Sequence, residues 1–215
     1  MRLRDKTAII VGAGQSPGEG IGNGRATALL FAREGAKVLA VDHRLESAGE
    51  TADLVKKEGG TCVPFAADVT KEATLKAAVD EAMKLWGRID VLHNNVGVSL
   101  AGGDANPLEI TEEAFDRVNA INLRGTIMAC KHALPVMRKQ QSGSIINISS
   151  VAALSSNYPT VAYKTTKAGM VAFTEQLAYQ NAEFGVRANA ILPGLMNTPM
   201  PVMKLASSEA RNSAA

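Results

Sequence analysis

Short apolar runs alternate along this chain with segments of helical periodicity. Six runs are rich in β-branched and aliphatic residues, at residues 7–11, 37–42, 61–66, 89–93, 143–149 and 186–192. Helical spacing of apolar residues fills the intervals, at residues 25–34, 47–58, 71–86, 112–140 and 161–184, and the long fourth segment is expected to bend around Gly125. Near-continuous apolar strands separated by helices are typical of a parallel sheet with helices on both faces. Because such crossovers are right-handed, the sequence predicts an α/β fold with one doubly wound parallel sheet.

Length and composition are those of one globular domain. The chain has 215 residues, of which 46% are hydrophobic and 20% are charged. A net charge of +2 without a basic run predicts neither a nucleic-acid partner nor an anionic membrane surface as partner. No apolar stretch has the length of a membrane span, and the charged N-terminus does not resemble a signal peptide. We therefore expect a cytoplasmic protein.

Cysteine and histidine usage predicts no metal site. Cys62 and Cys130 lie far apart and match no metal-ligand spacing, which favours reduced thiols over a disulfide framework. The three histidines, at positions 43, 93 and 132, are equally scattered and are interpreted as structural or surface residues.

Glycines and polar residues follow the predicted strands at one edge of the predicted sheet. They are Gly12, Asp42, Asp68, Asn95, Ser150 and residues 193–194. Ligands of doubly wound sheets bind outside the carboxyl ends of the strands. The convergence of these residues predicts a single site at that edge.

The loop after the first strand has the composition of a phosphate-binding turn. It runs from Gly12 to Gly24, includes Gly22, and opens a predicted helix, so that backbone N–H groups can approach a pyrophosphate. Asp42, which ends the second strand, is placed to accept hydrogen bonds from the adenosine ribose. Its charge would repel a 2′-phosphate and favours NAD over NADP, although Arg25 and Arg44 would weaken that preference. Asp42 as a cap of the next helix is the alternative.

Asp68 and Val69 follow the third strand and are candidates for holding the edge of the adenine. By physical chemistry alone, an aspartate just before a predicted helix is equally typical of an N-cap. Both interpretations stay open at this point.

Tyr163 and Lys167 lie four residues apart in a predicted helix, with Ser150 thirteen residues upstream of the tyrosine. Residues at this spacing share one helix face. A cation close to a phenol stabilises the phenolate and lowers its pKa, which makes a tyrosine useful for proton transfer. The Tyr-x-x-x-Lys pattern also arises by chance, so its meaning depends on the predicted cofactor site. Ser149 competes with Ser150, but the spacing favours Ser150.

With these motifs in place, the chain resembles the short-chain dehydrogenase/reductase family over residues 5–200. The matching stretches are residues 22–28, 68–69, 94–97, 122–125, 148–151, 163–167 and 193–194, with Thr198. The resemblance implies a Rossmann-type domain over residues 1–200. The chain ends soon after Thr198, so that the family's last strand is expected to be absent and residues 201–215 to be a truncated or disordered start of the C-terminal substrate region.

The resemblance also implies roles for individual residues. Ser150 would bind the substrate oxygen, Tyr163 would be the general acid–base, and Lys167 would lower the tyrosine pKa and bind the nicotinamide ribose. Asn122 would hold a water that relays protons. Asn95 would lie along the cofactor, and Thr198 would reach the carboxamide.

Together these features predict an NAD(H)-dependent oxidoreductase that interconverts a secondary alcohol and a ketone. The alternative is a dinucleotide-binding or scaffold protein that does not catalyse hydride transfer. The family resemblance further implies a homodimer or homotetramer built on the helices at residues 112–140 and 161–184.

Overall fold

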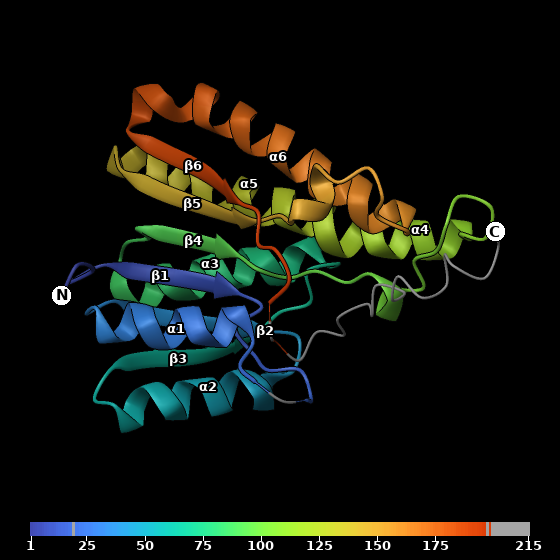
Figure 1. Ribbon diagram of the computed structural model, residues 1–215. Coiled ribbons are helices and arrows are strands. Elements are labelled where there is room, and N and C mark those ends of the chain that lie inside the picture. Colours follow the sequence, from blue (N-terminus) through green and yellow to red (C-terminus); the bar gives the residue numbers. More distant parts are fainter. Residues whose placement is uncertain (19, 197, 199–215) are drawn as a thin grey trace.

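Six strands form one parallel sheet in the order β3-β2-β1-β4-β5-β6 in the computed structural model, which describes residues 1–18, 20–196 and 198 (Figure 1). The strands are β1 (Thr7–Val11), β2 (Lys37–Asp42), β3 (Thr61–Ala66), β4 (Val91–Asn94), β5 (Gly143–Ile148) and β6 (Val186–Ile191). The chain moves outward from β1 to β3 and then resumes at β4 on the other side of β1. This strand order is that of a dinucleotide-binding sheet, with its switch point between β1 and β4. The predicted doubly wound fold is confirmed.

Helices cover the two faces of the sheet. They are α1 (Asn23–Arg33), α2 (Leu45–Lys57), α3 (Glu72–Trp86), α4 (Glu112–Asn119), α5 (Gly125–Gln140) and α6 (Val161–Asn181). One apolar cluster joins α1 and α2 to β1 and β2 through residues such as Ala28, Val55 and Ile10. The other joins α3, α5 and α6 to the opposite face, around Leu39 and Ile145. Strands β1 and β2 are apolar on both sides over residues 8–11 and 38–41 because helices bury both faces, whereas β4 also holds the buried polar residues His93 and Asn94.

The predicted single helix over residues 112–140 is interrupted. A five-residue π-helical turn, Ala120–Arg124, separates α4 from α5, and Gly125 itself has ordinary right-handed helical angles. Gly125 instead allows close packing, because a Cβ there would lie 2.9 Å from the Cβ of Val69. The irregularity therefore lies one turn earlier than the expected bend, at the position of Asn122. π-turns of this kind are frequent at functional sites.

Strand β4 begins two residues later than the sequence predicts. The backbone of Ile89 pairs with the side chain of Gln140, whose Oε1 accepts from Ile89 N at 2.9 Å and whose Nε2 donates to Ile89 O at 2.8 Å. Ile89 is thus fully buried without being part of the sheet ladder. The apolar character of Ile89 predicts burial, but it does not show that the backbone of Ile89 pairs with Gln140 and not with a neighbouring strand.

One face of β5 and β6 is less covered than the rest of the sheet. Within the described residues, alternate positions of β6, which are Arg187, Asn189 and Ile191, are exposed, and alternate positions of β5 are half-buried. The described helices include none that is long and apolar enough to cross a membrane.

Candidate functional site

Two glycines set the distance between β1 and α1. Gly12 has a φ of +83°, in the region that favours glycine. A Cβ on Gly24, at the start of α1, would lie 1.8 Å from Gly12 O, so that only glycine fits there. Asn95, just after β4, joins this arrangement because its Nδ2 donates to Gly12 O at 3.2 Å. The predicted cofactor residues Gly12, Gly24 and Asn95 therefore lie together at the switch point.

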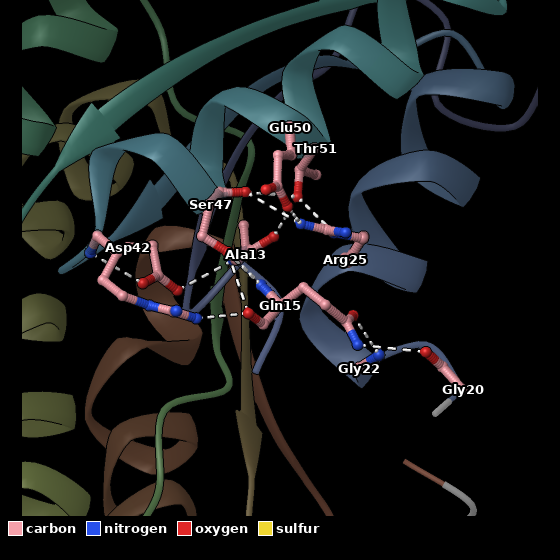
Figure 2. Close-up of polar contacts among 11 residues, drawn as sticks. Ala13, Gln15, Gly20, Gly22, Arg25, Asp42, Ser47, Glu50 and Thr51 are labelled. Atoms are coloured by element: carbon pink, nitrogen blue, oxygen red, sulfur yellow. Dashed lines mark hydrogen bonds and ion pairs between the residues drawn. The ribbon is translucent and has the colours of Figure 1, made fainter. Parts of the chain in front are cut away.

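The start of α1 is open to a ligand. Gly22 occupies the cap position without a side-chain hydrogen bond, and the first turn holds no acidic residue. Gln15 closes the glycine loop by accepting from Gly22 N at 2.8 Å through Oε1 and donating to Gly20 O at 3.2 Å through Nε2 (Figure 2). Within the part of the chain that the structure describes, the first N–H groups of α1 have no hydrogen-bond acceptor, and together with the positive end of the helix dipole they suit a phosphate.

Asp42 binds the glycine loop and does not cap a helix. Its Oδ2 accepts from Gly14 N at 3.0 Å, and its Oδ1 accepts from Arg44 N at 3.1 Å (Figure 2). Helix α2 begins at Leu45 with Arg44 in the cap position, so the capping alternative for Asp42 is wrong. A Cβ on Gly14 would lie 2.6 Å from Asp42 Oδ2, which explains the glycine at that position.

The two arginines near Asp42 are engaged in different contacts. Arg25 donates to Glu50 Oε2 at 2.7 Å, to Thr51 Oγ1 at 2.9 Å and to Ser47 O at 3.2 Å, and only 12% of its side chain is exposed. Arg44 donates to the backbone oxygen of Gln15. A cavity of about 320 Å³ lies between the glycine loop and the start of α2, lined by Gln15, Ser16, Pro17, Gly18, Arg44, Glu46, Ser47 and Glu50.

Asp68 forms a local turn after β3. Its Oδ1 accepts from the backbone N of Thr70 at 2.9 Å and from Thr70 Oγ1 at 2.7 Å. The hydroxyl of Thr70 lowers the pKa of the Asp68 carboxyl, against the opposing effect of burial. Because α3 begins at Glu72 with Lys71 in the cap position, the side chain of Asp68 is not its N-cap. Val69 lines a narrow pocket together with Val11, Asn94, Val96, Ile121, Gly125 and Thr126.

The two candidate serines have different surroundings. Ser149 is 3% exposed, and its Oγ donates to Lys167 O at 2.7 Å. Its hydroxyl proton is therefore not available to a ligand. Ser150 is half-buried, and its Oγ accepts from Ala152 N at 3.1 Å. This geometry favours Ser150 as the serine that meets a ligand.

Tyr163 and Lys167 lie on one face of α6, as their spacing predicts. The Lys167 Nζ lies 5.6 Å from the centre of the Tyr163 ring, and it donates to Ile148 O at 2.7 Å. Lys167 is 2% exposed, and burial lowers its pKa to about 8. The ring of Tyr158 stacks on that of Tyr163, with 5.4 Å between ring centres.

The pKa of Tyr163 differs in direction from the sequence prediction. Burial raises the pKa of the phenol, the Ser150 hydroxyl opposes this rise, and Tyr158 adds to it. Desolvation disfavours the phenolate more than the neighbouring groups stabilise it. The phenol is therefore protonated at neutral pH in this structure.

Asn122 connects three segments around the site. Its Oδ1 accepts from Val98 N at 2.8 Å, and its Nδ2 donates to Val98 O at 2.9 Å and to Thr166 Oγ1 at 3.2 Å. A Cβ on Gly97 would lie 3.1 Å from Lys167 Nζ and 3.7 Å from Asn122 Oδ1. Asn122, Gly97 and Lys167 thus meet beside the switch point.

Thr198 is half-buried, and its backbone N donates to Met196 O at 2.9 Å. The predicted substrate region over residues 201–215 lies outside the described residues. Among residues 1–18, 20–196 and 198, no group of three His, Cys, Asp or Glu side chains is arranged to hold a metal ion.

Two residues near Tyr163 escaped the sequence reasoning. Asp104 is 4% exposed and accepts hydrogen bonds from the start of α6. Lys164 donates to the backbone oxygens of Ala152 and Ser155, in the segment after Ser150. The contacts of Asp104 join segments 58 and 59 residues apart, and a lone acid in a glycine-rich loop carries no periodic signal. The partners of Lys164 are backbone oxygens of an irregular segment 9 and 12 residues away, which no side-chain pattern marks.

Comparisons with known proteins agree with this geometry. A family model described as short chain dehydrogenase matches residues 6–209. The chain is 38% identical to the uncharacterized oxidoreductase YxbG of Bacillus subtilis, over 97% of this chain and 72% of that protein. It is 36% identical to the 3-oxoacyl-[acyl-carrier-protein] reductase FabG of Thermotoga maritima, over 93% of this chain and 78% of that protein.

A solved structure has the same arrangement of elements. The crystal structure of a protein from Burkholderia xenovorans, provisionally assigned as a short-chain dehydrogenase/reductase, matches this chain with a TM-score of 0.87 and 39% sequence identity. The match covers 93% of this chain and 78% of that one.

Proposed function

This chain belongs to the short-chain dehydrogenase/reductase family of oxidoreductases, and we propose that it interconverts a secondary alcohol and a ketone with NAD(H). The observation that carries this proposal is that Tyr163 and the buried Lys167 share one face of α6, with the Lys167 Nζ 5.6 Å from the centre of the Tyr163 ring and 2.7 Å from Ile148 O, at the end of β5 that Ser150 follows. These three groups form a proton-transfer centre next to the glycine loop. When bound, the nicotinamide dinucleotide supplies the hydride chemistry.

The glycine loop and its neighbours fit a dinucleotide. Gly12, Gly22 and Gly24 leave room for close approach of a pyrophosphate, where the N-terminus of α1 offers N–H groups. Asp42 would accept from the adenosine ribose, and Asp68 with Val69 would hold the adenine edge. Asn95, Lys167 and Thr198 would hold the nicotinamide half.

The proton transfer follows from the local electrostatics. In the reducing direction, Tyr163 donates its phenolic proton to the carbonyl oxygen, and Ser150 hydrogen-bonds the same oxygen. The raised pKa of Tyr163 keeps that proton in place at neutral pH. Lys167 stabilises the phenolate that results, and Asn122 would hold a water through which the proton is replaced.

The charges around Asp42 support NAD over NADP. Asp42, Glu46 and Glu50 lie near the cavity beside the glycine loop, and Glu50 pairs with Arg25 at 2.7 Å. Arg44 is the other cation there, and it already binds Gln15 O. A 2′-phosphate would therefore meet more carboxylates than free cations.

Replacement of the phenol tests the catalytic assignment. Tyr163→Phe removes the phenolic hydroxyl that donates the proton and keeps the ring, so turnover of a panel of alcohols and ketones should fall by about 10³-fold. The dissociation constant for NAD, measured by calorimetry, should change little. Tyr179→Phe, at an 88% exposed position, is the matched control. Equal turnover of Tyr163→Phe and the parent would refute the assignment, and NAD binding without any turnover by the parent would favour the non-catalytic alternative.

A charge-removing variant tests the cofactor preference. Asp42→Asn keeps an oxygen that can accept from Gly14 N but removes the negative charge. We expect the ratio of NADP to NAD affinity to rise by about tenfold, equivalent to about 1.4 kcal/mol. A parent protein that binds NADP more tightly than NAD would contradict the preference.

We further propose that the chain forms a homodimer or homotetramer through the outward faces of α4, α5 and α6. Phe115 on α4 is an exposed aromatic residue, which supports burial of that face in an assembly. Light scattering coupled to size-exclusion chromatography tests this, and a monomer at micromolar concentration would contradict it.

A further inference from the structure

The first turn of α6, which carries Tyr163, is held by a loop that lies far away in the sequence. Asp104 Oδ1 accepts from Ala162 N at 2.9 Å, and Oδ2 accepts from Tyr163 N at 2.7 Å. The N–H of Val161 donates to Ala105 O at 2.9 Å. Three consecutive N–H groups that a helix start leaves unpaired are thus taken by two neighbouring residues of one loop.

This arrangement differs from an ordinary helix cap. Thr160 stands in the cap position of α6 but makes no side-chain cap bond. In α4, by contrast, Thr111 caps its own helix by accepting from Ala114 N at 3.2 Å. A local cap stabilises a helix wherever that helix lies, whereas a cap from 58 residues away also fixes where the helix starts.

The carboxylate of Asp104 depends on these N–H groups. It is 4% exposed, and no cation pairs with it among the residues that the structure describes. Its other side-chain neighbour is Ser99 Oγ at 3.4 Å, which also lies 3.3 Å from Thr160 Oγ1. A buried carboxylate is stabilised by backbone N–H donors and by the positive end of a helix dipole. The hydrogen bonds of the buried Asp104 carboxylate therefore stabilise α6 in the position where its first N–H groups reach that carboxylate.

The loop that contains Asp104 is fixed at its other end as well. Asn122 binds both backbone groups of Val98, and this segment directly follows Asn95 and Gly97 at the switch point. The loop from Val98 to Asp104 is thus held at both ends by side-chain hydrogen bonds, from Asn122 at Val98 and from Asp104 to α6. These contacts set the distance between the carboxyl end of β4 and the start of α6.

We infer that Asp104 is a positioning residue that fixes the start of α6 and thereby sets the position of the Tyr163 side chain relative to the end of β5, which Ser150 follows. The inference rests on the proposed function, because it concerns the placement of the proposed proton donor. A small displacement of a reacting group is expected to cost about 10²-fold in rate. The role is separate from that of Tyr163, Ser150 and Lys167, since Asp104 binds only the backbone of α6 and Ser99.

Asp104→Asn is the informative variant, because it keeps the side-chain size and one oxygen acceptor while it loses the second. We expect kcat to fall by about tenfold or more, with the KM for the ketone and the NAD dissociation constant within about twofold of the parent values. Thr111→Ala removes the local side-chain cap of α4 and is the control for the loss of a helix cap as such. It should lose a similar amount of stability with kcat unchanged.

Titration of the tyrosines gives a second measurement that does not need turnover. Absorbance of the tyrosinate is followed against pH, and the Tyr163→Phe curve is subtracted to isolate Tyr163 among the three tyrosines. Burial raises the Tyr163 pKa, so a displaced first turn of α6 should let the pKa fall toward its ordinary value in Asp104→Asn. A protein without any turnover refutes the proposed function and leaves this titration intact as a test of Asp104.

Three outcomes would overturn the inference. One is a parent-like kcat and Tyr163 titration in Asp104→Asn. Another is an equal loss of kcat in Thr111→Ala. The third is failure of Asp104→Asn to fold at a temperature where Thr111→Ala is folded, because Asp104 would then determine the fold and not the position of one helix.

Discussion

The cofactor half and the catalytic half of this site are built by opposite means. Around β1 and β2, close approach of backbone segments creates the site, and a side chain on Gly24 or Gly14 would collide with its neighbours. Around β5 and α6, buried polar side chains create it, and Asn122, Lys167 and Asp104 are all at most 4% exposed. The first region tolerates no added atoms, whereas the second tolerates no unpaired polar groups.

This difference indicates how each half fails. Overpacking in the cofactor half shifts the backbone and affects the fold and dinucleotide binding together. Loss of one polar partner in the catalytic half leaves another buried group unpaired, and it changes proton chemistry before it changes the fold.

The largest expected effect is that of Gly24→Ala. A Cβ there would lie 1.8 Å from Gly12 O, and backbone must move to accommodate it. We expect the free energy of unfolding, measured by urea denaturation, to fall by about 3 kcal/mol. NAD binding, measured by calorimetry, should be lost as well. Gly49→Ala in α2 is the control, since nothing lies within 4 Å of its Cβ position, and it should stabilise the protein by about 0.5 kcal/mol. Parent-like behaviour of Gly24→Ala would remove the basis of the contrast.

The buried ammonium of Lys167 predicts a dependence of stability on pH. Its pKa is lowered by burial from 10.5 to about 8, so between these values the unfolded chain holds a proton that the folded protein has released. The charge destabilises the fold fully below pH 8, and this penalty shrinks as the pH rises toward 10.5.

Lys167→Met tests this dependence. Its stability relative to the parent should be greater near about pH 7 than near about pH 9.5 by on the order of 2 kcal/mol. Urea denaturation at both pH values measures the difference, and Lys139→Met, at an exposed position, controls for the loss of a positive charge. A relative stability that stays constant with pH would show that Lys167 is not desolvated in the folded protein.

His93 is a buried polar residue on the face of the sheet that α1 covers, and its surroundings differ from those of Asn122 and Lys167. It is 4% exposed, and its Nδ1 has no hydrogen-bond partner among the described residues. Burial lowers its pKa from 6.5 to about 4, so the unfolded chain binds a proton in this window that the folded protein does not. Stability is therefore lost as the pH falls from 6.5 toward 4.

His93→Leu should reduce that loss. When the pH falls from about 7 to about 5, we expect the free energy of unfolding of the parent to decrease by on the order of 2 kcal/mol more than that of the variant. Chemical denaturation at both pH values measures this difference. The exposed residue His43, changed to glutamine, is the control. An identical acid dependence of parent and His93→Leu would contradict the burial of a neutral imidazole.

The smallest effect is expected at Lys164, a cation of the catalytic half that holds a loop and no reacting group. Its Nζ donates to Ala152 O at 3.2 Å and to Ser155 O, after Ser150. Lys164→Met should raise the KM for the ketone by about tenfold with a smaller change in kcat. Thr165→Ala, on the exposed side of the same turn, should leave both constants unchanged. A fall in kcat without a change in KM would place Lys164 closer to the chemistry.

The sequence predicted the sheet well because apolar strands and glycine-ended helices are local signals. It placed Tyr163 and Lys167 on one helix face for the same reason. Asp104 could not be found in this way, because its partners are backbone N–H groups 58 residues away. The direction of the Tyr163 pKa was missed because burial, which raises it, depends on the whole fold.

The π-turn at Ala120–Arg124 has a consequence for the length of the chain in this segment. Each residue added to or removed from a helix rotates the remainder of that helix by about 100°. A π-turn, however, accommodates one residue more than a regular helical turn, so a one-residue deletion within it would restore a regular helix and leave Cys130 and Met137 of α5 in the core. The extra residue therefore does not determine the packing of α5 and instead changes the backbone around Asn122 itself.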